Sequence, residues 1–211
     1  LPWTQVEKHT HKVVVVPTGS LEQHGHHLPL LTDSMIGSAI ANRAEAALGE
    51  EAMFLPMLWI GASDHHLGFP GTVSLSMEVY TKALIDLVEC LIGAGFRKIF
   101  LLNSHAGNII PASTALYEVN LRYHEEMPDL WLTFCSWFDL AREQVAGLDG
   151  MTQDNVLHAC EWETSVMMRA HGELVHTKKI MTTRTPFKSD FYSPDQSGRS
   201  RVSVTKTILQ M

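Results

Sequence analysis

Short aliphatic runs alternate along the chain with longer segments of helical periodicity. Val13–Val16 is an unbroken apolar run that predicts a buried strand, and Ala52–Trp59, Lys98–Leu102 and Leu130–Phe134 predict three more. Apolar positions three or four residues apart predict helices over 33–48, 77–93, 109–125 and 162–170. Four repeats of a strand followed by a helix are typical of a parallel sheet with helices on both faces. We therefore predict an α/β fold, a three-layer sandwich with a mostly parallel central sheet.

Polar loops rich in histidine and acids follow the predicted strands. In parallel sheets, ligands bind where loops leave the carboxyl ends of the strands. The sequence therefore predicts that residues far apart along the chain share one rim of the sheet. They are Glu22, His24, Asp33, His65, His66 and His105.

Composition narrows the class of protein. Hydrophobic residues make up 45% of the chain and charged residues 18%, which is a globular balance. The net charge of −7 argues against a nucleic-acid partner, and no apolar run is long enough to span a membrane. Three cysteines without short spacing exclude a disulfide framework, and no secretory leader is visible. We expect a cytoplasmic enzyme or binding protein that acts on a small molecule.

The length of 211 residues fits a single domain over 1–211. After Met181 aliphatic residues become sparse, so residues 188–203 predict a long loop, and residues 202–211 predict the start of another element. A domain rarely ends in a loop and one short element. We therefore expect the chain to lack its natural C-terminal end.

The first chemistry-bearing segment is Gly19–Gly25. Glu22 and His24 are two residues apart, so in an extended segment their side chains point to the same side. Asp33 follows nine residues after His24 at a predicted helix start, where a carboxylate is favoured. A carboxylate and an imidazole that converge suit a divalent metal ion. The alternative is that Asp33 only caps its helix and that Glu22 and His24 lie in a solvated loop.

Two further segments add histidine and glutamate. His105 directly follows a predicted strand, where it either reaches the same rim or hydrogen-bonds the loop backbone. Glu161 and Glu163 open the last predicted helix, about 200° apart around its axis. Glu163 is in register with an apolar stripe, so we predict that it faces inward as a ligand and that Glu161 faces outward. The alternative is that Glu163 pairs with an arginine or caps its own helix.

The segment Asp64–Thr72 is a glycine- and proline-rich loop that carries His65 and His66. We favour pocket lining over metal ligation for both histidines. The other segments supply Glu22, His24, Asp33, His105 and Glu163, which suffice for two divalent ions that share one carboxylate.

Four motifs in this order resemble the creatininase (creatinine amidohydrolase) family. The first is Gly19–Gly25, followed by Leu28-Pro29 and Thr32-Asp33. The second is His66–Thr72 with Ser74-Leu75, and the third is Asn103–Asn108. The last is His158-Ala159 with Glu163–Ser165.

The resemblance implies a two-metal centre of zinc, manganese or iron that hydrolyses a C–N amide bond. By motif position, metal ligation carries over to Glu22, His24, Asp33 and His105, with Asp33 as the bridge. A catalytic role carries over to His158, which we expect to donate a proton to the departing nitrogen. The resemblance also implies a homo-oligomer, because hexamers are common in the family. We expect His66 and the backbone of Ala106 and Gly107 to bind substrate.

The chain departs from the family at several positions. Members that hydrolyse creatinine have Tyr-Glu where this chain has Ala106-Gly107, and that Glu binds metal. We expect Glu163 to replace it. His26 stands where proline is usual and His65 where Glu is usual. We predict a dinuclear amidohydrolase acting on a small cyclic amide or a formamide; the alternative is a non-catalytic metal- or ligand-binding homologue.

Overall fold

The computed structural model describes residues 1–146, 148–153 and 156–181. Its centre is a four-stranded, all-parallel sheet in the order β2-β1-β3-β4. The strands are β1 (Val13–Thr18), β2 (Ala52–Phe54), β3 (Lys98–Asn103) and β4 (Trp131–Ser136). The predicted loop at 188–203 and element at 202–211 lie outside the described residues.

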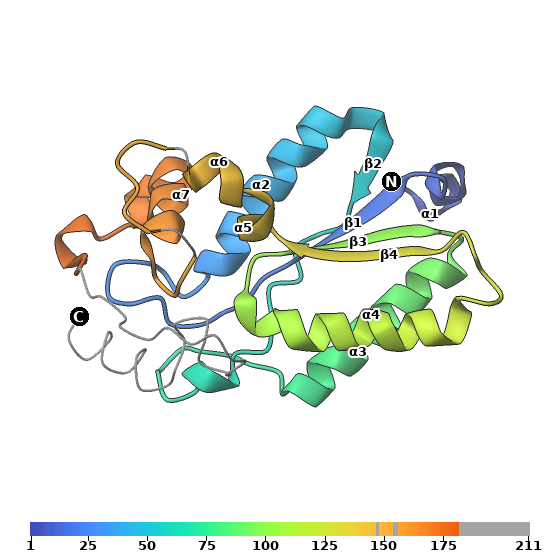
Figure 1. The fold of residues 1–211 in the computed structure, drawn as a ribbon, viewed down its shortest axis with the longest axis horizontal. Coiled ribbons are helices and arrows are strands. Elements are labelled where there is room, and N and C mark those ends of the chain that lie inside the picture. The colour runs from blue at the N-terminus through green and yellow to red at the C-terminus, as the bar shows by residue number, and fades with distance from the viewer. Residues whose placement is uncertain (147, 154–155, 182–211) are drawn as a thin grey trace.

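Helices cover both faces of this sheet. Figure 1 shows α3 and α4 together on one face, with α2 on the other face and α7 beside α2. The predicted α/β sandwich of three layers is therefore confirmed. The long helices are α2 (Thr32–Leu48), α3 (Met77–Gly93), α4 (Ile109–Tyr123) and α7 (Glu161–His171). Three short helices that the sequence did not predict are α1 (Trp3–Val6), α5 (Trp137–Leu140) and α6 (Arg142–Ala146).

Strand β2 is shorter than the predicted 52–59. Leu55 N still donates to the Val15 carbonyl oxygen at 2.9 Å, but the next N–H that donates to β1 comes three residues later instead of two. The chain then rejoins β1 only at Leu58, whose N–H donates to the Pro17 carbonyl oxygen at 2.9 Å. One extra residue between these two hydrogen bonds thus ends the regular strand, although the chain keeps following β1.

Strand β1 contributes to two apolar cores, one on each face of the sheet. Val14 and Val16 face the layer of α3 and α4, where they pack with residues such as Leu84. Val15 faces the layer of α2 and α7, where it packs with residues such as Met167. A parallel strand buried on both faces needs apolar side chains at successive positions, which explains the run Val13–Val16. In the described part of the chain, no helix combines the length and the apolar character needed to cross a bilayer.

The strand order fixes where a ligand site can form. From β1 the chain first moves to one side, to β2, and later places β3 on the other side of β1. The loops that leave β1 and β3 therefore diverge, and such a switch point opens a crevice at the carboxyl edge of the sheet. Glu22, His24 and Asp33 follow β1, and His105 follows β3.

Candidate metal centre

The loop between β1 and α2 folds back on itself and so brings its acids together. Glu22 N donates to the Leu30 carbonyl oxygen at 2.9 Å, which turns the segment toward the start of α2. Asp33 lies in the first helical turn, and Ser20 Oγ donates to its Oδ2 at 2.7 Å. Glu22, His24 and Asp33 are all buried. The alternative of a solvated loop is therefore wrong.

Two histidines approach Asp33 in the same way. His24 Nε2 lies 3.0 Å from Asp33 Oδ1, and His24 Nδ1 lies 3.2 Å from the Glu22 carbonyl oxygen. His105 Nδ1 lies 2.8 Å from Asp33 Oδ2, and His105 Nε2 lies 3.1 Å from the Ala62 carbonyl oxygen. A histidine that binds a metal ion commonly donates its other ring N–H to such a carbonyl. Both rings are thus held with one nitrogen directed at the acids.

Glu163 has two roles, one for each carboxylate oxygen. Its Oε2 accepts a hydrogen bond from Cys160 N at 3.0 Å and so caps α7, while its Oε1 lies 3.8 Å from His24 Nε2. Glu163 therefore both faces the cluster, as predicted, and caps its own helix, as the alternative proposed. Glu161 points elsewhere, because its Oε2 accepts hydrogen bonds from Thr152 N at 2.8 Å and Gln153 N at 3.0 Å.

The donors gather into three overlapping groups that could hold a cation. Within each group, one ligand atom per residue lies within 4.8 Å of the others. The groups are Glu22–His24–His158, Glu22–His65–His105 and His24–Asp33–Glu163. All five predicted ligands and His158 therefore meet at one place, together with His65.

The electrostatics of this cluster fit a cation. In the described part of the chain, the ion-pair partners of Glu22, Asp33 and Glu163 are all histidines. Glu22 Oε2 is buried without a hydrogen-bond partner among the described residues. Buried carboxylates are costly unless they are paired or bind a metal ion. The residues present therefore fit divalent metal ions.

Gln23 contacts two histidines of the cluster, which the sequence reasoning did not predict. Its side-chain Nε2 lies 2.7 Å from His158 Nε2 and 2.8 Å from His66 Nδ1, so the amide donates to both rings. The rings of His66 and His158 stack with centroids 4.3 Å apart. His158 then carries its proton on Nδ1, which lies 3.4 Å from Glu22 Oε1. The position of Gln23 between Glu22 and His24 in the first motif was the available clue.

Burial and neighbouring charges move the pKa values of these groups in opposite directions. Burial alone would raise the pKa of Asp33, but His24 and His105 outweigh it and hold that pKa well below its usual range. Burial lowers the pKa of His158 well below its usual value, and the nearby His24 and His66 add to this. Burial also lowers the pKa of His66, to about 2. The cluster thus keeps a charged carboxylate beside two neutral imidazoles.

The ligand cluster borders a small cavity. Its described lining consists of acids and histidines of the cluster together with five other residues. They are Glu22, Asp33, His65, His105, His158 and Glu163, and Ser104, Ala106, Phe138, Val156 and Leu157. Of the three predicted substrate-binding residues, only Ala106 is among the described residues that line this cavity. His66 is fully buried and stacks on His158, and Gly107 packs closely against His105. A Cβ at Gly107 would lie 2.2 Å from the Ala62 oxygen and 2.3 Å from His105 Nε2. Position 107 therefore has no room for a side chain.

The two asparagines that bound the third motif, Asn103 and Asn108, connect the loops near this cavity. Asn103 Oδ1 accepts a hydrogen bond from Thr18 Oγ1 at 3.1 Å, and its Nδ2 donates to the His105 carbonyl oxygen at 2.6 Å. Asn108 Nδ2 donates to the Gly19 carbonyl oxygen at 3.0 Å, and its Oδ1 accepts from Ala62 N at 3.0 Å. These bonds fix the loops after β1, β2 and β3 relative to one another.

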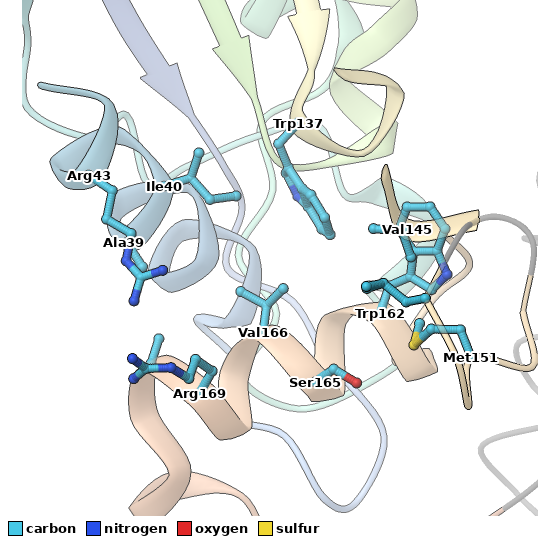
Figure 2. Close-up of a pocket in the computed structure, with 12 residues that line it drawn as sticks. Ala39, Ile40, Arg43, Trp137, Val145, Met151, Trp162, Ser165, Val166 and Arg169 are labelled. Atoms are coloured by element: carbon cyan, nitrogen blue, oxygen red, sulfur yellow. The ribbon is translucent and has the colours of Figure 1, made fainter. Parts of the chain in front are cut away.

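A second cavity, of about 300 Å³, lies on the other side of α7. Figure 2 shows Trp137, Trp162 and Val166 around it, with Arg43 and Arg169 together at one side. None of the lining residues that the structure describes is an acid or a histidine. None of the candidate metal ligands therefore belongs to the described lining of this second cavity.

Comparison with known proteins finds relatives that are named as a peptidase and as an amidohydrolase. It is 33% identical over 179 residues to a mycofactocin precursor peptide peptidase of Mycolicibacterium smegmatis, covering 82% of this chain and 64% of that protein. It is 28% identical over 180 residues to the creatinine amidohydrolase of Pseudomonas putida, covering 80% and 68%. It is also 36% identical over 104 residues to the peptidases of that name in Mycobacterium tuberculosis, covering 46% of this chain and 41% of those proteins.

Solved creatininase structures share the fold. A manganese form superimposes with a TM-score of 0.78 at 26% identity, covering 95% of this chain and 82% of that one. A zinc–zinc form gives a TM-score of 0.75 at 26% identity, covering 93% and 82%. A model of the family described as creatinine amidohydrolase matches residues 1–207. With the four motifs now placed around one buried cluster, the chain belongs to the creatininase family.

Proposed function

We propose that this chain is a dinuclear metal-dependent amidohydrolase that cleaves the C–N bond of a small cyclic amide or a formamide. One observation carries the proposal. The two carboxylate oxygens of Asp33 face different histidines, His24 at 3.0 Å and His105 at 2.8 Å, with Glu163 and Glu22 on the two sides. A carboxylate placed in this way suits a bridge between two ions.

The proposed ligands are the five predicted residues. Asp33 would be shared, with His24 and Glu163 on one side and Glu22 and His105 on the other. Zinc, manganese and iron all accept such nitrogen and oxygen donors. When bound, the ions would act as Lewis acids toward the carbonyl oxygen and lower the pKa of water to near neutrality.

His158 is the proposed proton carrier. It is neutral because its pKa is lowered by burial and by its histidine neighbours, so its ring can take up a proton and return it to the departing nitrogen. By donating to Nε2, Gln23 keeps the proton of the neutral His158 ring on Nδ1, and His66 supports the ring by stacking. The N–H groups of Ala106 and Gly107 are proposed to bind the carbonyl oxygen or the substrate.

Position 107 bears on the substrate. Because a side chain there would collide with His105, a glutamate ligand cannot be accommodated without displacing that ring. This supports Glu163 as the replacement ligand. It also supports weak or absent turnover of creatinine, since the family members that hydrolyse creatinine carry Tyr-Glu at positions 106 and 107.

The test combines metal analysis with a substrate panel of creatinine, other cyclic amides, formamides and short peptides. The last are included because of the peptidase relative. We expect about two ions per chain, and hydrolysis of at least one formamide or cyclic amide that stops on chelation and returns when zinc or manganese is added. Fewer than one ion per chain would contradict the proposal. Two ions without turnover of any panel member would favour the non-catalytic homologue instead.

We also propose that the chain forms homo-oligomers in the cytoplasm. The family resemblance supports oligomers, hexamers included, and the sparse cysteines support a reducing compartment. Sedimentation velocity of the purified chain tests the first part, because a single monomeric species at micromolar concentration would contradict it.

A further inference from the structure

His65 lies at the edge of the metal cavity and faces His105. It belongs to the short 3-10 turn Asp64–His66 and is half-buried, whereas its neighbour His66 is fully buried. The rings of His65 and His105 are nearly parallel, with an angle of 5° between their planes and 5.9 Å between their centroids. His65 therefore lines the cavity together with Glu22 and His105.

The positions of the donor atoms distinguish His65 from an ordinary wall residue. One ring nitrogen of His65, one of His105 and one oxygen of Glu22 all lie within 4.8 Å of one another. Zinc–ligand bonds of about 2.0–2.2 Å allow small side-chain rotations to bring three such atoms onto one ion. In addition, Glu22 Oε2 is buried and has no hydrogen-bond partner among the described residues, and its ion-pair contact is His105 Nε2 at 3.4 Å, so a cation bound on this side would compensate its burial.

We propose that His65 is a direct metal ligand and that Glu22, His65 and His105 form a zinc-selective half of the centre. This rests on the proposed function. Besides the shared Asp33, the set provides two imidazoles and one carboxylate, which is a common donor set of catalytic zinc sites. Besides the shared Asp33, the other half provides one imidazole, His24, and one carboxylate, Glu163, so it has fewer nitrogen donors. Oxygen-rich sets suit manganese better, so the two halves differ in metal preference.

The competing interpretation is that His65 only lines the substrate pocket. In that case its replacement changes KM and leaves metal binding intact. If His65 is a ligand, its replacement weakens the binding of one ion and leaves the binding of the other unchanged. Metal binding measured without substrate therefore separates the two interpretations, and it does not depend on finding the substrate.

The experiment titrates metal-free protein with Zn²⁺ and, separately, with Mn²⁺ by calorimetry against a competing chelator. The variants are His65→Ala and His65→Glu, and the control is His124→Ala, which removes an exposed histidine just after α4. We expect His65→Ala to weaken one of two Zn²⁺ sites by at least about tenfold, the lower end of what even outer-shell partners contribute. His65→Glu keeps a donor but replaces the imidazole, so it should shift that site toward Mn²⁺. The control should bind like the wild type.

Three outcomes would overturn the inference. The first is that both sites of His65→Ala bind Zn²⁺ with unchanged affinity, and the second is that His65→Glu keeps the wild-type preference for Zn²⁺. The third is that His65→Ala weakens Zn²⁺ binding equally at both sites while its metal-free form melts at the wild-type temperature. If His65→Ala does not fold, His65→Glu alone decides. A wild-type chain that binds no ion would instead contradict the proposed function, so the two failures are distinguishable.

Discussion

The two cavities beside α7 differ sharply in chemistry although neighbouring residues of one helix line them. Glu163 faces the first cavity, which is bordered by acids and histidines, whereas Trp162 and Val166 face the second, apolar cavity. Successive residues of a helix are about 100° apart, so a single step along α7 changes the environment from charged to apolar. One helix thus serves stability on one side and the candidate reaction on the other.

The largest effect is expected at the centre of the polar cavity. Asp33→Ala removes the carboxylate that lies between His24 and His105, so both ions should be lost and turnover should fall to background. Elemental analysis and the substrate panel measure this. Loss of only one ion would show that Asp33 is a terminal ligand and not a bridge.

The next effect separates the two acids of α7. Glu163→Gln removes the charge that faces His24 while keeping the size, so one ion should be lost and the rate should drop steeply. Glu161→Gln is the matched control, because Glu161 binds Thr152 and Gln153 instead. Metal content after dialysis distinguishes them. If Glu161→Gln strips the metal and Glu163→Gln does not, the assignment of Glu163 is wrong.

His158→Ala should leave both ions bound and still slow the reaction. Loss of a general acid–base group typically costs about 10²–10⁴-fold in rate. Steady-state kinetics combined with metal analysis detect this signature, which differs from that of either acid. A variant that loses metal in parallel with activity would make His158 a ligand, as its place near Glu22 and His24 also allows.

On the apolar side, Trp162→Ala should reduce stability rather than metal content. The Trp162 side chain is almost fully buried, and its Nε1 donates to the Gln153 carbonyl oxygen at 2.8 Å. Truncating a buried tryptophan typically costs about 3–5 kcal/mol in the free energy of unfolding. Urea denaturation measures the loss. An unchanged unfolding midpoint would mean that the apolar cavity collapses without penalty.

The smallest effect concerns the thiol at the start of α7. Burial and the nearby Glu163 raise the pKa of Cys160 well above its usual value, so the thiol stays protonated at neutral pH and reacts slowly. Cys90 is exposed. Iodoacetamide should therefore modify Cys90 first, without loss of turnover, as mass spectrometry can show. Rapid labelling of Cys160 in the folded protein would contradict its burial beside the polar cavity.

The sequence indicated most of the sheet and the long helices because local patterns encode them. Val13–Val16 is apolar at every position since both faces of β1 are covered, and Ser76 begins α3 by accepting a hydrogen bond from Val79 N at 3.3 Å. The limits of β2 were wrong because one extra residue between the hydrogen bonds of Leu55 and Leu58 to β1 interrupts the ladder, and the apolar character of the segment does not reveal it. The short helices α5 and α6 span only one turn or slightly more, and so short a segment shows no periodicity.

For the site, motif order and strand topology were sufficient to group the five proposed ligands. Their mutual geometry came only from tertiary contacts. Gln23 connects His66 with His158, which is 135 residues away along the chain, and no local pattern records such a bond. Likewise, the sequence shows His65 only as a residue of a loop. The tertiary structure adds that this loop, which follows β2, stacks the His65 ring on that of His105.

The sequence by itself thus determined the family, the parallel α/β architecture and the kinds of donor at the carboxyl edge. The family, the architecture and the donor types depend on residue type and on short-range spacing, which can be obtained from the sequence directly. Tertiary structure alone decided which oxygen of Asp33 faces which histidine, that Glu163 both caps α7 and faces His24, and that Gly107 has no room for a side chain. Those features depend on distances between segments far apart in sequence, and only the packing of the loops around β1 and β3 sets them.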